Sequence, residues 1–156
     1  MKDLVAYFSA SGSTAKLAGT LASAAGAELY EILPAVPYER RDLNWMDKKS
    51  RSTLEMQDRS CRPPLADTDA PVAEAERIFL GFPIWWYREP SVVDSFLDAY
   101  DFAGKTIVPF FTSGGSQLGE GQARIETLAR GARVLPGRRF GARAGEKELK
   151  AWLDSL

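Results

Sequence analysis

The chain has 156 residues, of which 45% are hydrophobic and 26% are charged, a composition that predicts one globular domain over residues 1–156. The formal net charge of −1 gives no reason to expect a nucleic-acid or membrane partner. The sequence contains no histidine, which makes a histidine-based hydrolase or a zinc enzyme a poor interpretation.

The N-terminal segment combines a buried strand, a hydroxyl-rich turn and a helix. Leu4–Phe8 is apolar and leads directly into Ser9-Ala10-Ser11-Gly12-Ser13-Thr14. A helical stripe follows, formed by Leu17, Ala18, Leu21, Ala22 and Ala25. A helix N-terminus offers unpaired N–H groups and the positive end of the helix dipole. We therefore expect a terminal phosphate to be held by Ser9, Ser11, Gly12, Ser13 and Thr14, although a plain capped turn is the alternative.

The next part of the chain predicts an edge strand and then a long irregular region. Leu29–Leu33 has the pattern of a strand, and Glu31 within it is typical of a sheet edge. Pro34 ends this strand. We expect a charged surface helix over Leu43–Met56 and an irregular connection over residues 62–71.

Strands and helices alternate in the C-terminal half. Buried strands are predicted over Arg77–Pro83, Thr106–Phe111 and Arg133–Leu135. Helices are predicted from Pro90 as the first helical position, over Gln122–Arg130, and after Gly145. Pro109 lies within a predicted strand and indicates a local defect in its hydrogen-bond ladder. Such alternation predicts a parallel sheet with right-handed crossovers.

Two further segments follow the carboxyl ends of strands, where parallel sheets bind ligands. The loop Pro83-Ile84-Trp85-Trp86-Tyr87-Arg88-Glu89-Pro90 brings three aromatic side chains together, and it suits a flat ring; a core cover or a subunit contact is the alternative. The glycine-rich loop over residues 112–119 lets its backbone approach a ligand closely, unless it is simply flexible. Together the three segments predict a phosphorylated planar ligand such as FMN.

These motifs resemble those of the flavodoxin family. The turn over residues 9–14 is similar to the family's phosphate loop, and the Trp-Trp and Thr-x-Gly-Gly loops resemble a bacterial flavodoxin-like subgroup. The resemblance implies a flavodoxin-like three-layer α/β/α sandwich with a five-stranded parallel sheet in the order 2-1-3-4-5. It also implies an FMN ring flanked by Pro83, Ile84, Trp85 and Trp86, with its polar edge lined by Thr112, Ser113, Gly114 and Gly115.

Three features depart from that family pattern. Tyr87 stands where glycine is expected, and tyrosine resists positive φ. Arg88 follows it, and it either points inward to favour reduced flavin or is a solvated surface arginine. The nearly neutral chain also differs from strongly acidic electron carriers, which weakens the case for docking on a basic partner.

Two functions remain open at this point. The favoured one is an FMN-binding electron carrier that cycles through a flavin semiquinone and serves a redox partner protein, because Trp85, Trp86 and Tyr87 argue against an open ring face. The alternative is an FMN-dependent NAD(P)H:quinone-type oxidoreductase. A flavodoxin-like domain without useful FMN affinity is the third interpretation. The protein is expected to be cytoplasmic, because the chain enters a strand without a leader pattern. A monomer and a homodimer are both open.

Overall fold

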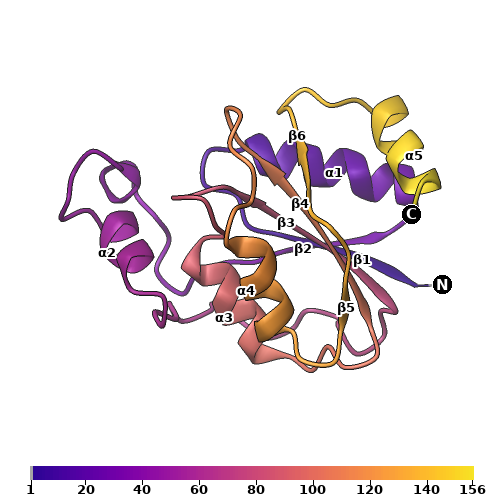
Figure 1. The fold of residues 1–156 in the computed structure, drawn as a ribbon, viewed down its shortest axis with the longest axis horizontal. Helices are drawn as coiled ribbons and strands as arrows, with labels where there is room; N and C mark the ends of the chain where they lie inside the picture. Colours follow the sequence, from indigo (N-terminus) through magenta and orange to yellow (C-terminus); the bar gives the residue numbers. More distant parts are fainter. Residues whose placement is uncertain (1) are drawn as a thin grey trace.

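A parallel sheet at the centre of the molecule carries helices on both faces (Figure 1). The computed structural model describes residues 2–156. Its strands are β1 (Asp3–Tyr7), β2 (Glu28–Glu31), β3 (Arg77–Pro83), β4 (Thr106–Thr112), β5 (Arg133–Val134) and β6 (Arg138–Phe140). Its helices are α1 (Ser13–Ala25), α2 (Arg51–Gln57), α3 (Ser91–Ala99), α4 (Gly121–Leu128) and α5 (Glu146–Asp154), with a 3₁₀ helix η1 (Arg40–Leu43).

The strand order β2-β1-β3-β4-β5 confirms the predicted flavodoxin-like topology. All the strand pairs in the described chain are parallel. Among the strands of residues 2–156, β2 pairs only with β1, so the charged strand lies at the edge as predicted. One expectation needs correction, because a sixth strand, β6, also pairs with β4. With three residues, β6 is too short to produce a readable alternation in the sequence.

The predicted ladder defect at Pro109 lies on the outer side of β4. β5 pairs with Thr106 and Ile107, and β6 pairs with residues 110–112, so the outer neighbour is interrupted beside Pro109. The carbonyl of Ile107 accepts a hydrogen bond from Leu135 on this side at 2.9 Å. Alternate residues of a strand point the same way, so the missing N–H of Pro109 faces the interruption. The ladder between β3 and β4 continues through Pro109.

Alternate residues of the strands build one core on each face of the sheet. On one face, Val5, Phe79 and Val108 pack with residues of α1 and α5. On the other face, Leu4, Ile78 and Ile107 pack with residues of α3 and α4. Figure 1 shows these two helix pairs on opposite sides, which confirms three layers. Both sheet faces are therefore covered, as the continuous apolar strands predict. Within residues 2–156, no helix combines the length and apolar character needed to cross a membrane.

The predicted helix over Leu43–Met56 is wrong over residues 44–50. The structure has η1 at its start and α2 only from Arg51, and Figure 1 shows α2 standing away from the sheet. Between them, the side chains of Asn44 and Asp47 accept hydrogen bonds from backbone N–H groups two residues later. These local bonds compete with helix formation. α3 also begins one residue later than predicted, because Pro90 is its N-cap and Ser91 is its first helical residue.

Candidate functional site

The three predicted ligand-binding segments meet at the carboxyl edge of the sheet. The hydroxyls of Thr14 and Thr112 share a hydrogen bond of 2.8 Å, which joins the first segment to the third. The N–H of Ile84 donates to the carbonyl of Thr112 at 3.0 Å, which joins the second segment to the third. Phe8 immediately precedes the first segment, and its ring packs edge to face against Trp85 with centroids 5.7 Å apart, which brings the first segment beside the second.

The turn before α1 has the form of an anion cradle. Gly12 is the N-cap residue with φ of 97°, and a Cβ built there would meet no atom within 4 Å. The Ser9 hydroxyl accepts from the N–H groups of Gly12 and Ala15 at 3.1 and 3.2 Å. The first N–H groups of a helix have no partner within it, which leaves those of Ser13 and Thr14 for a ligand. Ser11 and Gly12 are exposed beside them.

Thr14 has a second function within this turn. Its side chain is buried and its hydroxyl is already bonded to Thr112. The group that Thr14 can offer to a ligand is therefore its backbone N–H. Its side chain fixes the turn to the glycine-rich loop.

The second segment forms a tight hairpin over residues 85–88. The N–H of Trp85 donates to the carbonyl of Arg88 at 3.0 Å, and the reverse bond measures 3.1 Å. The two central residues, Trp86 and Tyr87, have φ of 47° and 64°. Positive φ at both positions is the mark of a type I′ turn, which usually contains asparagine and glycine. Tyr87 thus adopts the glycine-type backbone that it resists, and such strain is common at functional sites.

The aromatic residues of this hairpin differ in exposure. Trp86 is 41% exposed and Tyr87 is 67% exposed, so both present surface for a ligand. Trp85 is half-buried and packs edge to face against Phe8 and Tyr38. Trp85 consequently belongs partly to the core, whereas the side chains of Trp86 and Tyr87 are held outside it. Pro83 and Ile84, at the base of the loop, are also half-buried.

The third segment is shaped by a side chain that the sequence did not reveal. Arg139 of β6 donates from Nε to the Ser113 hydroxyl at 3.1 Å and from Nη2 to the Ser113 carbonyl at 2.8 Å. The Ser113 hydroxyl donates to the carbonyl of Ser116 at 2.6 Å. Gly114 and Gly115 lie exposed within the loop that these bonds close. No sequence signal links Arg139 to Ser113, because their proximity depends on β6 pairing with β4.

Gly119 brings the third segment against the hairpin. It has φ of 58°, and a Cβ at this position would lie 2.8 Å from the carbonyl oxygen of Tyr87. A side chain could not fit there without moving the hairpin. The turn that carries Trp86 and Tyr87 is therefore braced by the glycine-rich loop.

Arg88 contradicts both predictions made for it. It is neither a surface arginine nor a side chain aimed at a ligand, because it is 1% exposed and points into the protein. Its guanidinium donates to the carbonyl of Met56, at the end of α2, at 3.0 Å. It also lies 3.3 Å from the Asp94 carboxylate of α3. Arg88 thus connects the hairpin to the body of the protein.

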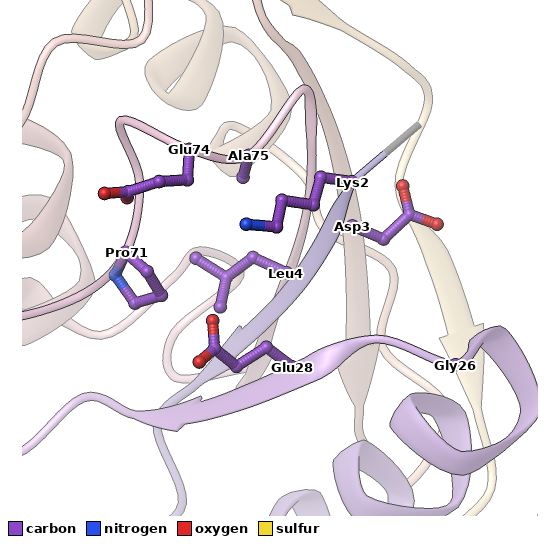
Figure 2. Close-up of a pocket in the computed structure, with 8 residues that line it drawn as sticks. All are labelled: Lys2, Asp3, Leu4, Gly26, Glu28, Pro71, Glu74 and Ala75. Atoms are coloured by element: carbon purple, nitrogen blue, oxygen red, sulfur yellow. The ribbon is translucent and has the colours of Figure 1, made fainter.

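A pocket at the opposite end of the sheet is a poor place for a phosphate. It has a volume of about 350 Å³ and lies around the start of β1, where Figure 2 shows Lys2 among acidic side chains. Asp3, Glu28 and Glu74 line it. Asp3 already pairs with Arg77 at 2.7 Å. Net negative charge would repel a phosphate, so the carboxyl edge is the better site.

The fold and this edge define a nucleotide-binding α/β protein whose site suits FMN. The helix N-terminus fits a phosphate, and the open space beside Gly12 leaves room for it. The exposed rings of Trp86 and Tyr87 fit a planar heterocycle. The exposed backbone of Gly114 and Gly115 fits its hydrogen-bonding edge.

Comparison with known proteins identifies the family. The flavodoxin family model matches residues 2–156, and the chain belongs to the flavodoxin family. A candidate flavoprotein from Bacteroides eggerthii DSM 20697 is similar at 41% identity, with 99% of this chain and 97% of that chain covered and a TM-score of 0.93. A candidate flavoprotein from Bacteroides uniformis ATCC 8492 is similar at 42% identity, with 98% and 97% covered and a TM-score of 0.92.

A more distant structure shares the fold. It is a flavoprotein in complex with FMN from Lactobacillus acidophilus NCFM, at 22% identity, with 97% of this chain and 98% of that chain covered and a TM-score of 0.73. A search of the curated proteins finds no match to this chain.

Proposed function

We propose that this chain binds FMN and transfers single electrons to a redox partner protein. The observation that carries the proposal is the convergence of a helix N-terminus, an exposed aromatic turn and a glycine-rich loop at one sheet edge. Membership of the flavodoxin family and the FMN complex of the L. acidophilus protein support FMN as the cofactor. When bound, FMN supplies the redox chemistry, and the protein supplies binding and orientation.

The first turn of α1 would bind the phosphate. The N–H groups of Ser13 and Thr14 are free donors at the positive end of the helix dipole. The exposed hydroxyl of Ser11 and the half-buried hydroxyl of Ser13 add further donors around them. Ser9 would hold the turn in shape through its bonds to the N–H groups of Gly12 and Ala15.

The hairpin and the third loop would hold the ring. Trp86 and Tyr87 offer aromatic surface on one side, with Trp85 at the start of the hairpin and Pro83 and Ile84 at its base. The third loop offers backbone groups to the polar edge of the ring, chiefly the N–H of Gly114. The N–H of Gly115 already donates to the Ser113 hydroxyl at 3.3 Å. Arg139 fixes that loop through Ser113, so the donors are positioned before a ligand arrives.

An FMN-dependent reductase that takes electrons from NAD(P)H is the second candidate. The formal net charge of −1 favours it, because a carrier that docks on a basic partner is usually acidic. The protruding rings of Trp86 and Tyr87 favour the carrier, since they occupy space that a second planar substrate would need.

The phosphate cradle can be tested with a carboxylate. Ser13→Asp would place a negative charge at the phosphate site and should abolish FMN binding, measured by the fluorescence change when apoprotein is titrated with FMN. Ser23→Asp, on an exposed position near the other end of α1, is the matched control and should bind like the unmodified chain. Unchanged affinity in Ser13→Asp would contradict the cradle.

The ring site can be tested at the hairpin. Trp86→Ala should weaken FMN binding by about 1–3 kcal/mol if the indole stacks on the ring, by analogy with stacking of bases on aromatic side chains. Trp86→Phe should retain much of the affinity because it keeps an aromatic face. Equal affinities in the unmodified chain and Trp86→Ala would remove Trp86 from the site.

A further inference from the structure

Four charged residues are packed together behind the aromatic hairpin, and we call them the buried ion cluster: Arg88, Glu89, Asp94 and Arg124. Arg88 is 1% exposed, and Glu89 and Asp94 are completely buried. Arg124 reaches the cluster from α4 and is only partly exposed. Charges are rarely removed from water in this way unless they are paired and hydrogen-bonded.

The two arginines contact only one oxygen of each carboxylate. Arg124 donates from Nε to Glu89 Oε1 at 2.8 Å and from Nη2 to Asp94 Oδ2 at 2.6 Å. Arg88 Nη1 lies 3.3 Å from the same Asp94 Oδ2 and 3.8 Å from Glu89 Oε1. Both arginines therefore lie nearest to the same two oxygens, Glu89 Oε1 and Asp94 Oδ2.

The other two carboxylate oxygens have no partner. Within residues 2–156, Glu89 Oε2 and Asp94 Oδ1 are buried and make no hydrogen bond to an assigned donor. An ionised carboxylate can only accept hydrogen bonds, so two ionised carboxylates cannot satisfy each other. A protonated carboxyl carries an O–H donor, and one proton between the two groups would satisfy both oxygens at once.

The environment of the pair favours retention of that proton. Burial raises the pKa of Glu89 to about 8, with the negative charge of Asp94 adding to the shift and Arg124 opposing it. Burial also raises the pKa of Asp94, although hydrogen bonding and the charges of Arg124 and Arg88 oppose that shift. Near neutral pH the pair is therefore expected to carry one proton.

We propose that Glu89 and Asp94 share one proton, and that this protonated pair is the positioning element that fixes the hairpin over residues 85–88 for the flavin ring. The inference rests on the proposed FMN function for its ligand. Arg88 provides the mechanical link, because its backbone closes the hairpin with Trp85 and its guanidinium lies in the buried ion cluster. The cluster also holds α2, through the bond from Arg88 to the Met56 carbonyl.

The charged groups around the pair come from every neighbouring element. Those in the cluster are Arg88 on the hairpin, Asp94 on α3 and Arg124 on α4. Arg62, on the connection after α2, lies 3.8 Å from Asp94 Oδ2 and is itself paired with Asp98 at 2.6 Å. At the rim, Glu120 pairs with Arg59 at 2.9 Å. None of these groups donates to the two unpartnered oxygens, and a proton shared by the pair would serve both.

Loss of the proton would leave two buried carboxylates, each with one oxygen that no donor of the cluster reaches. Their repulsion would push Glu89 away from Asp94, and Arg88 would follow because it is the adjacent residue and shares the cluster. The strained turn at Trp86 and Tyr87 would then lose its fixed base. FMN affinity should consequently fall as the pair deprotonates.

The test compares FMN dissociation constants between pH 6.5 and pH 9 in the unmodified chain and in Glu89→Gln. Glutamine imitates the protonated acid, since it keeps an acceptor for Arg124 and gains a donor for Asp94. In the unmodified chain the dissociation constant should rise about tenfold from pH 7 to pH 9, because only the protonated fraction binds well. In Glu89→Gln this rise should disappear. Glu126→Gln, at an exposed position on α4, should behave like the unmodified chain.

A second variant covers the case in which Glu89→Gln does not fold, and a measurement on the apoprotein tests the hairpin without FMN. Asp94→Asn also provides a donor between the two groups, and it too should flatten the profile if Glu89→Gln does not fold. Hydrogen exchange of the Trp85 and Arg88 amides in the apoprotein, corrected for intrinsic pH dependence, should lose protection between pH 7 and pH 9 in the unmodified chain only.

The two possible failures are distinguishable. Absence of FMN binding at pH 6.5 would overturn the proposed function but leave the exchange measurement available. The inference itself is overturned if the unmodified chain shows no such transition, or if both amide variants retain it.

Discussion

Removing both hydroxyls from the buried pair formed by Thr14 and Thr112 should destabilise the protein by less than the sum of the two single removals. The two hydroxyls are 2.8 Å apart, and both side chains are buried. Thr14→Val or Thr112→Val alone leaves the other hydroxyl without a partner, which costs about 1–3 kcal/mol. The double variant replaces both polar groups by similarly shaped apolar groups, and its cost should be smaller than the sum of the two single costs.

The measurement is urea unfolding of the four apoproteins of this cycle, followed by far-ultraviolet circular dichroism. We expect a coupling energy of about 1–2 kcal/mol between the two sites. Thr20→Val is the control, because its hydroxyl bonds only to the Lys16 carbonyl within α1, and it should change stability by less than about 0.5 kcal/mol. Additivity of the two single variants within about 0.5 kcal/mol would refute a bond that ties the phosphate turn to the third loop.

Three other outcomes follow from the hairpin and from the cluster behind it. Tyr87→Gly should raise the free energy of unfolding by up to about 1 kcal/mol, because φ of 64° is strained for tyrosine; a urea midpoint that falls would contradict this. Gly119→Ala should lower the free energy of unfolding by about 1–3 kcal/mol through its clash with the Tyr87 carbonyl. Gly114→Ala has open space around the new methyl group and should change it much less. Equal urea midpoints for the two variants would argue against a contact between Gly119 and the hairpin. Burial raises the pKa of Glu89 from its ordinary 4.5 to about 8, so between pH 4.5 and pH 8 the folded state binds more protons than the unfolded state. The free energy of unfolding should therefore fall as pH rises through this range, by up to about 1.4 kcal/mol per pH unit. A pH series of urea unfolding should show this slope in the unmodified chain and lose it in Glu89→Gln, and equal slopes in both would exclude the titration.

The central strands and the turn before α1 are predictable because their determinants are local. Leu4–Phe8 is apolar at every position, which is typical of a strand buried on both faces. Gly12 at a strand-to-helix turn indicates an N-terminal cradle, and the structure has it as the αL N-cap of α1. Pro109 predicts a ladder defect, although the sequence does not say that the outer neighbour breaks beside it.

The remaining features depend on contacts between distant parts of the chain. Arg88 looks like a loop arginine in the sequence, and its burial depends on meeting Asp94 from α3 and the Met56 carbonyl from α2. Arg139 reaches Ser113 only because β6 adds to the sheet. The irregular segment before α2 follows from side-chain bonds of Asn44 and Asp47, which are weak signals beside a run of charged residues.

The most direct test of the proposed function is an anaerobic reductive titration of the FMN-loaded protein, followed by visible absorbance. We expect a band from one-electron-reduced flavin at intermediate reduction, which would identify an electron carrier with a protein partner. Direct bleaching from oxidised to fully reduced flavin would contradict the carrier and favour the NAD(P)H-dependent reductase. A protein that cannot be loaded with FMN would contradict both functions.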